Sequence, residues 1–245
     1  IIVVAFRKLP AEIFSIPKHG TINLHASLLP NYRGAAPINW CLINNEEKTG
    51  VTTFFINEKI DQGDVLLKKE VNISDKDNFG TLYRKLSSVG SRLLIKTIKG
   101  VLSNSLQASK QDFDKSSKIA PKLSKENTRI DWNKSQKEII GMIRGLSPKP
   151  GAWTILKNGD DKIRMKILEA KKAKGFFPKE VGKFLIHNGE IHINNGIDAI
   201  NCTEVQLENR KVMNAKELIN GLEIQENSHV YWYKQSDYQQ ITPIY

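Results

Sequence analysis

Residues 21–40 read TINLHASLLPNYRGAAPINW, and this stretch decides the fold that we predict. Residues 21–25 read as a strand, and a loop rich in proline, glycine and asparagine follows at residues 26–36. Pro37 suits the first position of a helix that runs to Ile43. A strand, a loop and a helix in this order are typical of an α/β unit.

The sequence on both sides of this stretch extends the same unit. Residues 1–6, IIVVAF, form a short apolar, β-branched run of the kind found in parallel strands that are buried on both faces. Residues 51–56 and 65–71 are two further predicted strands. A long helix should follow, capped by Asp75 or Asp77. Its apolar residues recur at helical spacing, which predicts that it covers one face of the sheet: Leu82, Leu86, Val89, Leu93 and Ile98.

The rest of the chain predicts a second, mostly β unit. The apolar pattern fades at residues 103–127, which is typical of a linker. Ser135 with Glu138, and Asn214 with Glu217, each fit a capping box at the start of a helix. Short alternating segments lie between these helices, separated by Asn-Gly pairs of the kind that tight hairpins favour: residues 158–159, 188–189 and 195–196. Many short strands with one or two helices predict a small OB-like β-barrel.

The chain carries a formal net charge of +11 and has a pI near 9.5, which favours an anionic partner. Two groups of basic residues stand out, and such stripes suggest a polyanion such as RNA. The first group is Lys110, Lys115, Lys118, Lys122, Lys125 and Arg129, and the second is Lys162, Arg164, Lys166, Lys171, Lys172, Lys174, Lys179 and Lys183. A solvated linker and solvated strand faces are the other explanation for these side chains.

Cys41 and Cys202 are the two cysteines, and they lie far apart in the sequence without metal-ligand spacing. They argue against a disulfide framework and against a structural zinc site, and they fit a reducing cytoplasm. No apolar run approaches the ~20 residues that span a bilayer, so we expect no membrane partner. The opening IIVVAF lacks the charged start, the length and the cleavage site of a signal peptide.

Three polar residues are candidates for a catalytic site. Asn23 and His25 stand at the C-terminal end of a predicted strand, where open α/β sheets bind their ligands. Asp61, in the sequence IDQGD, lies on a loop that can fold back towards them. Each residue alone also has a structural explanation, because a histidine at a strand end is often a satisfied structural group. An aspartate shortly before a glycine, here Gly63, often forms a turn.

The surroundings of these three residues resemble a known superfamily. NLHASLLPNYRGAAPINW at residues 23–40 and TGVTTFFINEKIDQGDVL at residues 49–66 are similar to the signature of folate-dependent formyltransferases. Within that superfamily, RGAAPI at residues 33–38, APKLSKENTRIDW at 120–132 and SPKPGAW at 147–153 resemble the methionyl-tRNA formyltransferases. The resemblance covers essentially the whole chain.

This resemblance implies a two-domain architecture. Residues 1–105 would be the C-terminal half of a Rossmann-like formyltransferase catalytic domain, residues 106–127 a basic linker, and residues 128–245 an OB-like C-terminal tRNA-binding domain. In the family the nucleotide-fold domain begins well before the position of Ile1, so we expect the catalytic domain to be incomplete at its N-terminus. By itself, the 245-residue chain should self-associate through an exposed strand edge and be inactive.

The resemblance also implies an enzyme that transfers a formyl group from 10-formyltetrahydrofolate to the free amino group of initiator methionyl-tRNA, for translation initiation. It would act in the cytoplasm, as a monomer when full length and without a metal ion. When the amine attacks the formyl carbon, the carbonyl oxygen becomes negative and the nitrogen must lose a proton. Asn23 and His25 would aim N–H groups at this oxyanion, and Asp61 would orient His25 or relay the proton.

A loop for the folate cosubstrate follows from the resemblance too. Two leucines on a proline-bounded loop also suit contact with a flat ring system, although core packing explains them equally. The implied folate-binding residues are Ser27, Leu28, Leu29 and Pro30, with further contacts from Phe6, Arg7, Lys8 and Leu9. For Tyr32 and Arg33 the sequence leaves open whether the side chains face the substrate or solvent.

Other functions fit parts of the sequence. A formyltransferase acting on an amino sugar nucleotide is the nearest alternative, because YRG followed by PINW also occurs in that branch. The AAPI tetrapeptide, the KLSKENTRIDW segment and the basic barrel favour tRNA. Glycinamide ribonucleotide formyltransferases usually end soon after the first domain. A non-catalytic RNA-binding module, with the α/β part as a scaffold, is the alternative from another class, and the presence of all three site residues speaks against it.

Overall fold

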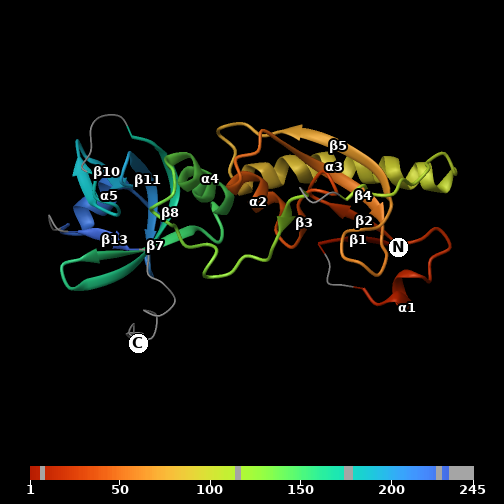
Figure 1. The fold of residues 1–245 in the computed structure, drawn as a ribbon, viewed down its shortest axis with the longest axis horizontal. Coiled ribbons are helices and arrows are strands. Elements are labelled where there is room, and N and C mark those ends of the chain that lie inside the picture. The colour runs from red at the N-terminus through yellow and green to blue at the C-terminus, as the bar shows by residue number, and fades with distance from the viewer. Residues whose placement is uncertain (6–8, 114–116, 174–178, 225–227, 232–245) are drawn as a thin grey trace. The chain divides into compact units, whose positions relative to one another are not determined.

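Two units make up the chain, Ile1–Leu123 and Ser124–Tyr245, and each has its own sheet (Figure 1). This computed structural model describes residues 1–5, 9–113, 117–173, 179–224 and 228–231. Five residues that carry sequence-based expectations lie outside these ranges: Phe6, Arg7 and Lys8 of the implied folate pocket, Lys115 of the first basic group and Lys174 of the second.

A mixed sheet is the centre of the N-terminal unit. Its strands are β1 (Ile2–Val4), β2 (Ile22–His25), β4 (Lys48–Phe55) and β5 (Val65–Asn72), in the order β1-β2-β4-β5. Only β1 and β2 run parallel among these pairs, whereas β4 pairs antiparallel with both β2 and β5. The predicted strands are therefore confirmed. Strand β1 is a parallel strand, as the opening run predicted, and the antiparallel pairs of β4 make the sheet mixed.

Strand β1 differs from its expected burial. Val3 is buried, but Ile2 and Val4 are 44% and 52% exposed. The prediction of burial on both faces is therefore wrong. Because successive side chains alternate across a strand, Ile2 and Val4 share the face opposite to Val3. In the described sheet β1 is also a terminal strand with one neighbour.

The long helix α3 (Phe79–Leu102) covers one face of this sheet, against β4 and β5, as predicted (Figure 1). Its cap is Asn78, whose side chain accepts from the Thr81 amide while the Thr81 hydroxyl accepts from the Asn78 amide. The expected cap at Asp75 or Asp77 is therefore wrong. The nearer of the two, Asp77, directly precedes the observed cap. Gly90 allows close packing, because a Cβ there would lie 2.9 Å from a methyl carbon of Leu24.

Short elements surround the loop after β2. They are α1 (Ala11–Phe14), β3 (Arg33–Gly34), α2 (Pro37–Ile43), which begins at Pro37 as predicted, and β6 (Ile119–Ala120). Strand β6 pairs parallel with β3, and the Tyr32 amide donates to the Lys118 carbonyl oxygen at 2.7 Å. Farther along, the carbonyl oxygen of Pro121 accepts a hydrogen bond from the Trp40 indole. Residues up to Pro121 of the predicted linker therefore pack on the first unit.

The C-terminal unit holds an antiparallel sheet that is nearly closed into a barrel. The described strands are β7 (Ala152–Asn158), β8 (Asp161–Lys172), β9 (Phe184–His187), β10 (Glu190–Asn194), β11 (Ala199–Leu207), β12 (Met213–Asn214) and β13 (His229–Tyr231). They follow the order β13-β7-β8-β11-β10-β9, with β12 beside β11. Backbone hydrogen bonds join Phe184 to Ser228 and Val230 to Gly182, so the two ends of this order meet.

Two helices complete the C-terminal unit, and both begin at the predicted capping boxes. Helix α4 (Gln136–Leu146) is capped by Ser135 and α5 (Ala215–Gly221) by Asn214. The pair Asn188–Gly189 forms a two-residue hairpin turn with φ of 52° and 72°, as the Asn-Gly rule predicts. No helix within the described ranges is both long enough and apolar enough to span a membrane.

Candidate active site

Strand β2 places Asn23 and His25 on the same face of the sheet, because residues two apart share a strand face. The intervening Leu24 points to the opposite face and packs in the core beneath α3. His25 is only 7% exposed, and Asn23 is half-buried. The Oδ1 atom of Asn23 is buried and accepts no hydrogen bond from any described residue. Two polar side chains therefore lie together at the C-terminal end of β2.

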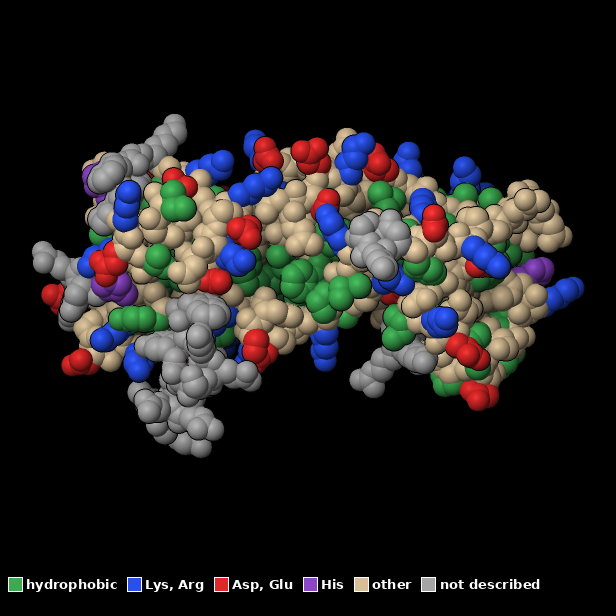
Figure 2. Space-filling view, viewed as in Figure 1, with side chains coloured by type: hydrophobic (Ala, Val, Ile, Leu, Met, Phe, Trp, Pro, Cys, Tyr) green, Lys and Arg blue, Asp and Glu red, His purple; other side chains and the backbone are tan. Residues whose placement is uncertain are grey.

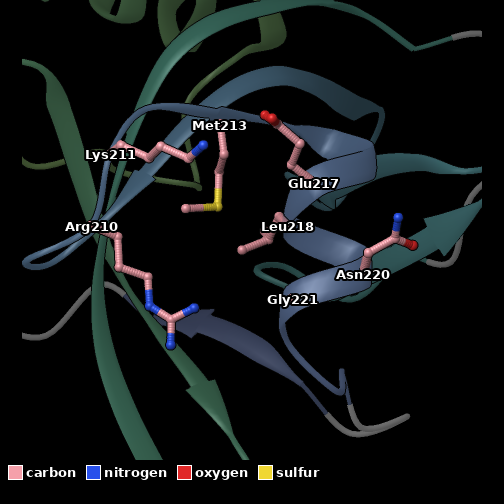
Figure 3. Close-up of a pocket in the computed structure, with 7 residues that line it drawn as sticks. All are labelled: Arg210, Lys211, Met213, Glu217, Leu218, Asn220 and Gly221. Atoms are coloured by element: carbon pink, nitrogen blue, oxygen red, sulfur yellow. The ribbon is translucent and has the colours of Figure 1, made fainter.

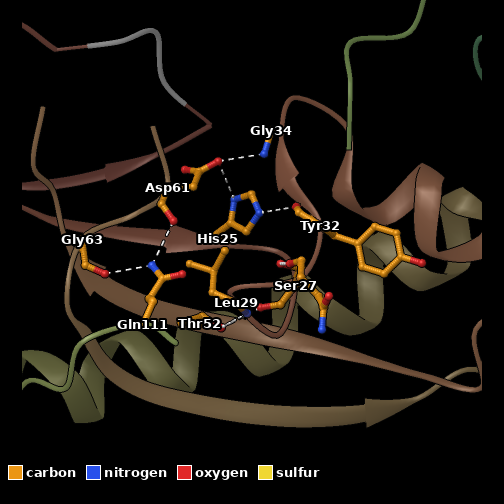
Figure 4. A network of polar contacts seen from close by, with 10 residues as sticks. His25, Ser27, Leu29, Tyr32, Gly34, Thr52, Asp61, Gly63 and Gln111 are labelled. Carbon is orange, nitrogen blue, oxygen red and sulfur yellow. Dashed lines mark hydrogen bonds and ion pairs between the residues drawn. The ribbon is translucent and has the colours of Figure 1, made fainter. Parts of the chain in front are cut away.

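The imidazole of His25 has a defined orientation (Figure 4). Its Nε2 lies 2.8 Å from the carbonyl oxygen of Tyr32, and its Nδ1 lies 3.8 Å from Oδ2 of Asp61. A carbonyl oxygen only accepts, so Nε2 carries the hydrogen of this bond. In a neutral ring Nδ1 is then an acceptor. A proton bound at Nδ1 would face the carboxylate of Asp61.

Asp61 lies in the turn between β4 and β5 and is held at two places. Its Oδ2 accepts from the Gly34 amide at 2.9 Å, and its backbone carbonyl accepts from the Gln111 side chain at 2.9 Å. Its φ of 52° is in the left-handed region, which aspartate tolerates better than most residues. Gly63 follows in the same turn, where a Cβ would lie 1.6 Å from the Phe55 carbonyl oxygen. The structure thus brings Asp61 next to His25.

The loop of residues 27–30 is anchored by β4 and β5. The Thr52 hydroxyl donates to the Ser27 carbonyl oxygen at 2.6 Å and accepts from the Leu29 amide at 3.2 Å. The ammonium of Lys68 donates to the Leu29 carbonyl oxygen, and burial lowers the pKa of Lys68 below its ordinary value. These contacts fix the backbone of the loop.

The side chains of the same loop have different surroundings. Ser27 and Leu29 are buried, and Leu29 packs with Phe54 and Val65 in a small core cluster. Leu28 and Pro30 are partly exposed. Any ligand on the surface of this loop would therefore meet the side chains of Leu28 and Pro30 before those of Ser27 and Leu29.

Tyr32 and Arg33, which the sequence left undecided, both pack against protein. Tyr32 belongs to the core under α3, and its hydroxyl donates to Glu46 at 2.5 Å. Burial together with the hydrogen bond to Glu46 raises the pKa of the Tyr32 hydroxyl well above its ordinary value. The guanidinium of Arg33 lies 4.6 Å from the centre of the Phe113 ring. The contribution of Tyr32 to the site is its backbone carbonyl.

Sequence reasoning missed several groups that shape this site. They are the Tyr32 carbonyl, the Gly34 amide, and the side chains of Thr52, Lys68 and Gln111. Two of them act through the backbone, which every residue has, so no residue type marks them. Gln111 lies in the segment whose composition indicated a linker.

The described residues of the C-terminal unit form an open hollow of about 520 Å³ beside α5 (Figure 3). It is lined by Arg210, Lys211, Met213, Glu217, Leu218, Asn220 and Gly221. None of the residues that the sequence placed at the catalytic site or the folate site contributes to it. In the described part of the chain no group of three or more His, Cys, Asp and Glu side chains is arranged to hold a metal ion.

On the face that Figure 2 shows, basic side chains are not gathered in one patch. On the face shown in Figure 2, lysines and arginines stand among aspartates and glutamates. Some members of the two basic groups have structural contacts. Lys118 pairs with Glu46, Lys171 lies 3.6 Å from Glu190, and the guanidinium of Arg164 lies 4.5 Å from the Trp153 ring centre. Fewer lysines and arginines of each group are therefore available to bind an anionic partner than the sequence suggests.

Comparison with known proteins places this chain in a family. The Formyl transferase family profile matches residues 1–98, and the profile of the Formyl transferase C-terminal domain matches residues 122–223. Methionyl-tRNA formyltransferase of Flavobacterium johnsoniae is 46% identical over 230 residues, which cover 94% of this chain and 73% of that protein. The protein of the same name from Thermodesulfovibrio yellowstonii is 44% identical over 231 residues, covering 92% of this chain and 71% of that protein.

Solved structures have the same fold. HypX from Aquifex aeolicus, in complex with tetrahydrofolic acid, superposes with a TM-score of 0.65 at 19% identity, over 89% of this chain and 38% of that chain. An N-formyltransferase from Helicobacter canadensis, in complex with folinic acid and dTDP-3-aminofucose, superposes with a TM-score of 0.58 at 25% identity. That alignment covers 74% of this chain and 65% of the other.

A mixed sheet with a polar pair at the end of β2, followed by a nearly closed antiparallel sheet, therefore defines a formyl transferase with its characteristic C-terminal domain. Five relatives named methionyl-tRNA formyltransferase are 39–46% identical to this chain over about nine tenths of its length. The chain belongs to the methionyl-tRNA formyltransferases.

Proposed function

We propose that this protein transfers the formyl group of 10-formyltetrahydrofolate to the amino group of initiator methionyl-tRNA, for translation initiation. The observation that carries the proposal is the pairing of His25 with Asp61 at the end of β2, with Asn23 on the same strand face. A 46% identical methionyl-tRNA formyltransferase supports the choice of acceptor. The free, buried state of both cysteines fits the reducing cytoplasm in which translation takes place.

The proposed chemistry follows from the charges that the reaction creates. The attacking amine turns the formyl carbonyl oxygen into an oxyanion, which preorganised N–H donors stabilise. We assign this role to the side-chain amide of Asn23 and to an N–H of the His25 ring, whose Nε2 donates to the Tyr32 carbonyl and whose Nδ1 faces Asp61 before the substrates bind. Asp61 would stabilise the positive ring and take part in removing the proton from the amine.

The proposed folate site is the loop of residues 27–30, whose backbone is fixed by Thr52 and Lys68. Leu28 and Pro30, which are partly exposed, would supply apolar contacts to the ring system. Ser27 and Leu29 would act by holding the loop. Transfer between two bound substrates requires no metal ion in this scheme.

The same proposal completes the architecture. We interpret the N-terminal unit as part of a Rossmann-like catalytic domain, because β1 and β2 run parallel and the polar pair lies at the C-terminal end of β2. The C-terminal unit would be an OB-like domain that binds the tRNA, since its short antiparallel strands nearly close into a barrel and many of its lysines are exposed. The protein would act as a monomer.

The two alternatives fit less well. The sugar-acting relative from Helicobacter canadensis is 25% identical over 74% of the chain, well below the 46% of the methionyl-tRNA formyltransferase. A non-catalytic RNA-binding module gives no reason for an oriented histidine that faces a carboxylate at 3.8 Å. Neither alternative is favoured.

A formylation assay with the purified full-length protein tests the proposal. The formyl donor is 10-formyltetrahydrofolate, and the acceptors are initiator methionyl-tRNA, uncharged initiator tRNA and dTDP-3-aminofucose. We expect formyl transfer to methionyl-tRNA only. Transfer to the sugar nucleotide alone would assign the protein to the other branch of the family, and RNA binding without any transfer would favour the non-catalytic module.

A further inference from the structure

The segment that follows α3 passes over the turn that carries Asp61. Ser109 and Val65 exchange two backbone hydrogen bonds, of 2.9 and 2.7 Å, and Gln111 comes two residues later. The Nε2 of Gln111 donates to the carbonyl oxygens of Asp61 and Gly63 at 2.9 and 2.8 Å (Figure 4). We call residues 109–113 the strap. Its central side chain contacts the turn on both sides of Gln62.

The geometry of the two hydrogen bonds suits a clamp. A side-chain amide nitrogen has two N–H donors, and both are used here on carbonyls of one turn. The turn needs such support because Asp61 has a φ of 52°, in a region that costs free energy for residues other than glycine. Ile60, next to it, is 62% exposed and adds little packing. Gln111 is partly buried, so water competes less well for these bonds.

The strap also contacts the loop that binds the Asp61 carboxylate. Its last residue, Phe113, lies under the guanidinium of Arg33 at 4.6 Å. Gly34, which follows Arg33 in the sequence, donates its amide hydrogen to Oδ2 of Asp61. The strap therefore holds both partners of this hydrogen bond, the turn through Gln111 and the β3 loop through Phe113. The same Oδ2 is the atom that faces His25.

We propose that Gln111 is a positioning residue that sets the distance between the Asp61 carboxylate and His25. This inference rests on the proposed function, in which Asp61 supports the charged ring of His25. Without the two hydrogen bonds the turn relaxes, and the Nδ1–Oδ2 separation of 3.8 Å is no longer maintained. A displacement of about 1 Å can cost a rate factor of about 100. Gln111 itself touches neither substrate.

The test compares steady-state kinetics of five variants of the full-length protein in the formylation assay. Gln111→Met has nearly the same length and lacks both donors, and Gln111→Glu removes the donors while it stays polar. Ser109→Ala is the matched control, because this exposed strap residue contacts Val65 mainly through its backbone. Asp61→Asn is the reference, alone and combined with Gln111→Met. Rates are measured well below the melting temperature of the least stable variant.

We expect both Gln111 variants to lower kcat by about 10- to 100-fold, with KM for folate and for tRNA nearly unchanged. The double variant should be no slower than Asp61→Asn alone, because residues that act through one another are not additive. Ser109→Ala should behave as wild type.

Several results would overturn the proposal: normal kcat in both Gln111 variants, an effect confined to KM, a double variant slowed by the product of the two single effects, or loss of the fold in both Gln111 variants. An unchanged kcat in Asp61→Asn would instead contradict the proposed mechanism itself. The two failures are thereby distinguished, since only the second leaves kcat of the Asp61→Asn single variant unchanged.

Discussion

The carbonyl oxygen of Tyr32 lies 2.8 Å from Nε2 of His25 and fixes the ring with Nδ1 towards Asp61. Tyr32 has a φ of 58°, an uncommon conformation for a residue other than glycine. Its side chain is buried in the core and bonded to Glu46, so the conformation is held by packing. The orientation of the proposed catalytic ring is thus a property of the core, transmitted by one backbone carbonyl.

Replacing the ring gives the first prediction. His25→Ala should lower kcat by about 100-fold or more, because loss of one oxyanion donor typically has this effect, and folate binding should stay mostly intact. The exposed His19 on the same unit provides the control, and His19→Ala should keep wild-type kinetics. Single-turnover formylation and folate titration measure the two effects. Near-normal turnover in His25→Ala would mean that another group stabilises the oxyanion.

Asp77 gives a prediction on stability and pH. It is buried beside the start of α3 and accepts hydrogen bonds from the Ser74 amide, Thr81 and Lys85, at 2.7, 3.0 and 2.6 Å. Burial alone would raise the pKa of Asp77, but these hydrogen bonds outweigh it and hold the pKa below its ordinary value. The folded state therefore binds the proton less tightly than the unfolded state does. The stabilisation is present above the unfolded pKa and is lost as the pH falls through the folded pKa.

We therefore expect Asp77→Asn to reduce the free energy of unfolding by about 1–3 kcal/mol at pH 7, as for other hydrogen bonds to charged groups. The difference from wild type should begin to shrink below about pH 4, where the carboxylate of the unfolded state takes up a proton, and should vanish once the folded-state carboxylate is protonated as well. Urea unfolding at pH 7 and pH 3 measures it. Asp75→Asn, at the exposed position two residues earlier, should leave the stability unchanged. A pH-independent difference would show that shape, not charge, matters at Asp77.

The two cysteines give a chemical prediction. Both are free and fully buried, and burial raises the pKa of Cys41 to about 12 and that of Cys202 further. From the ordinary value of 9.0, this shift leaves about a thousandfold less Cys41 thiolate, which is the reactive form. In native buffer at pH 8 a thiol reagent should label neither cysteine quickly, and in urea it should label both. Rapid labelling of Cys41 in the native protein would contradict its described burial.

The sequence predicted the features that depend on a few neighbouring residues. The start of α2 at Pro37, the capping boxes at Ser135 and Asn214, and the turn at residues 188–189 all have a local physical cause. The candidate pair of His25 with Asp61 needed the family resemblance, because their approach depends on how the turn after β4 folds back.

Contacts between distant segments were not predictable in the same way. The side chain of Gln111 bonds to carbonyls that lie 50 and 48 positions earlier, and carbonyls leave no trace in the residue types. A segment with few apolar residues reads as a linker even when backbone pairing, such as that of β6 with β3, holds it in place. The exposure of Ile2 and Val4 likewise depends on which elements cover that face of β1, and a short apolar run does not specify this.

The last prediction concerns the proposed tRNA partner. Lysines that contact phosphates release counterions, so each such contact steepens the fall of log affinity with log salt by about one unit. Lys171 and Lys172 are exposed on β8 of the C-terminal unit. Because Lys171 pairs with Glu190, neutralisation is a cleaner change there than charge reversal. Lys171→Gln with Lys172→Gln should therefore weaken tRNA binding and reduce the slope by up to about two.

The control is Lys96→Gln with Lys99→Gln on α3, which removes the same net charge from exposed positions of the other unit. Affinities measured at several salt concentrations should give the control the wild-type slope. An unchanged slope in the β8 variant would show that these barrel lysines do not contact the tRNA. An equal reduction in the control would show that only overall charge acts.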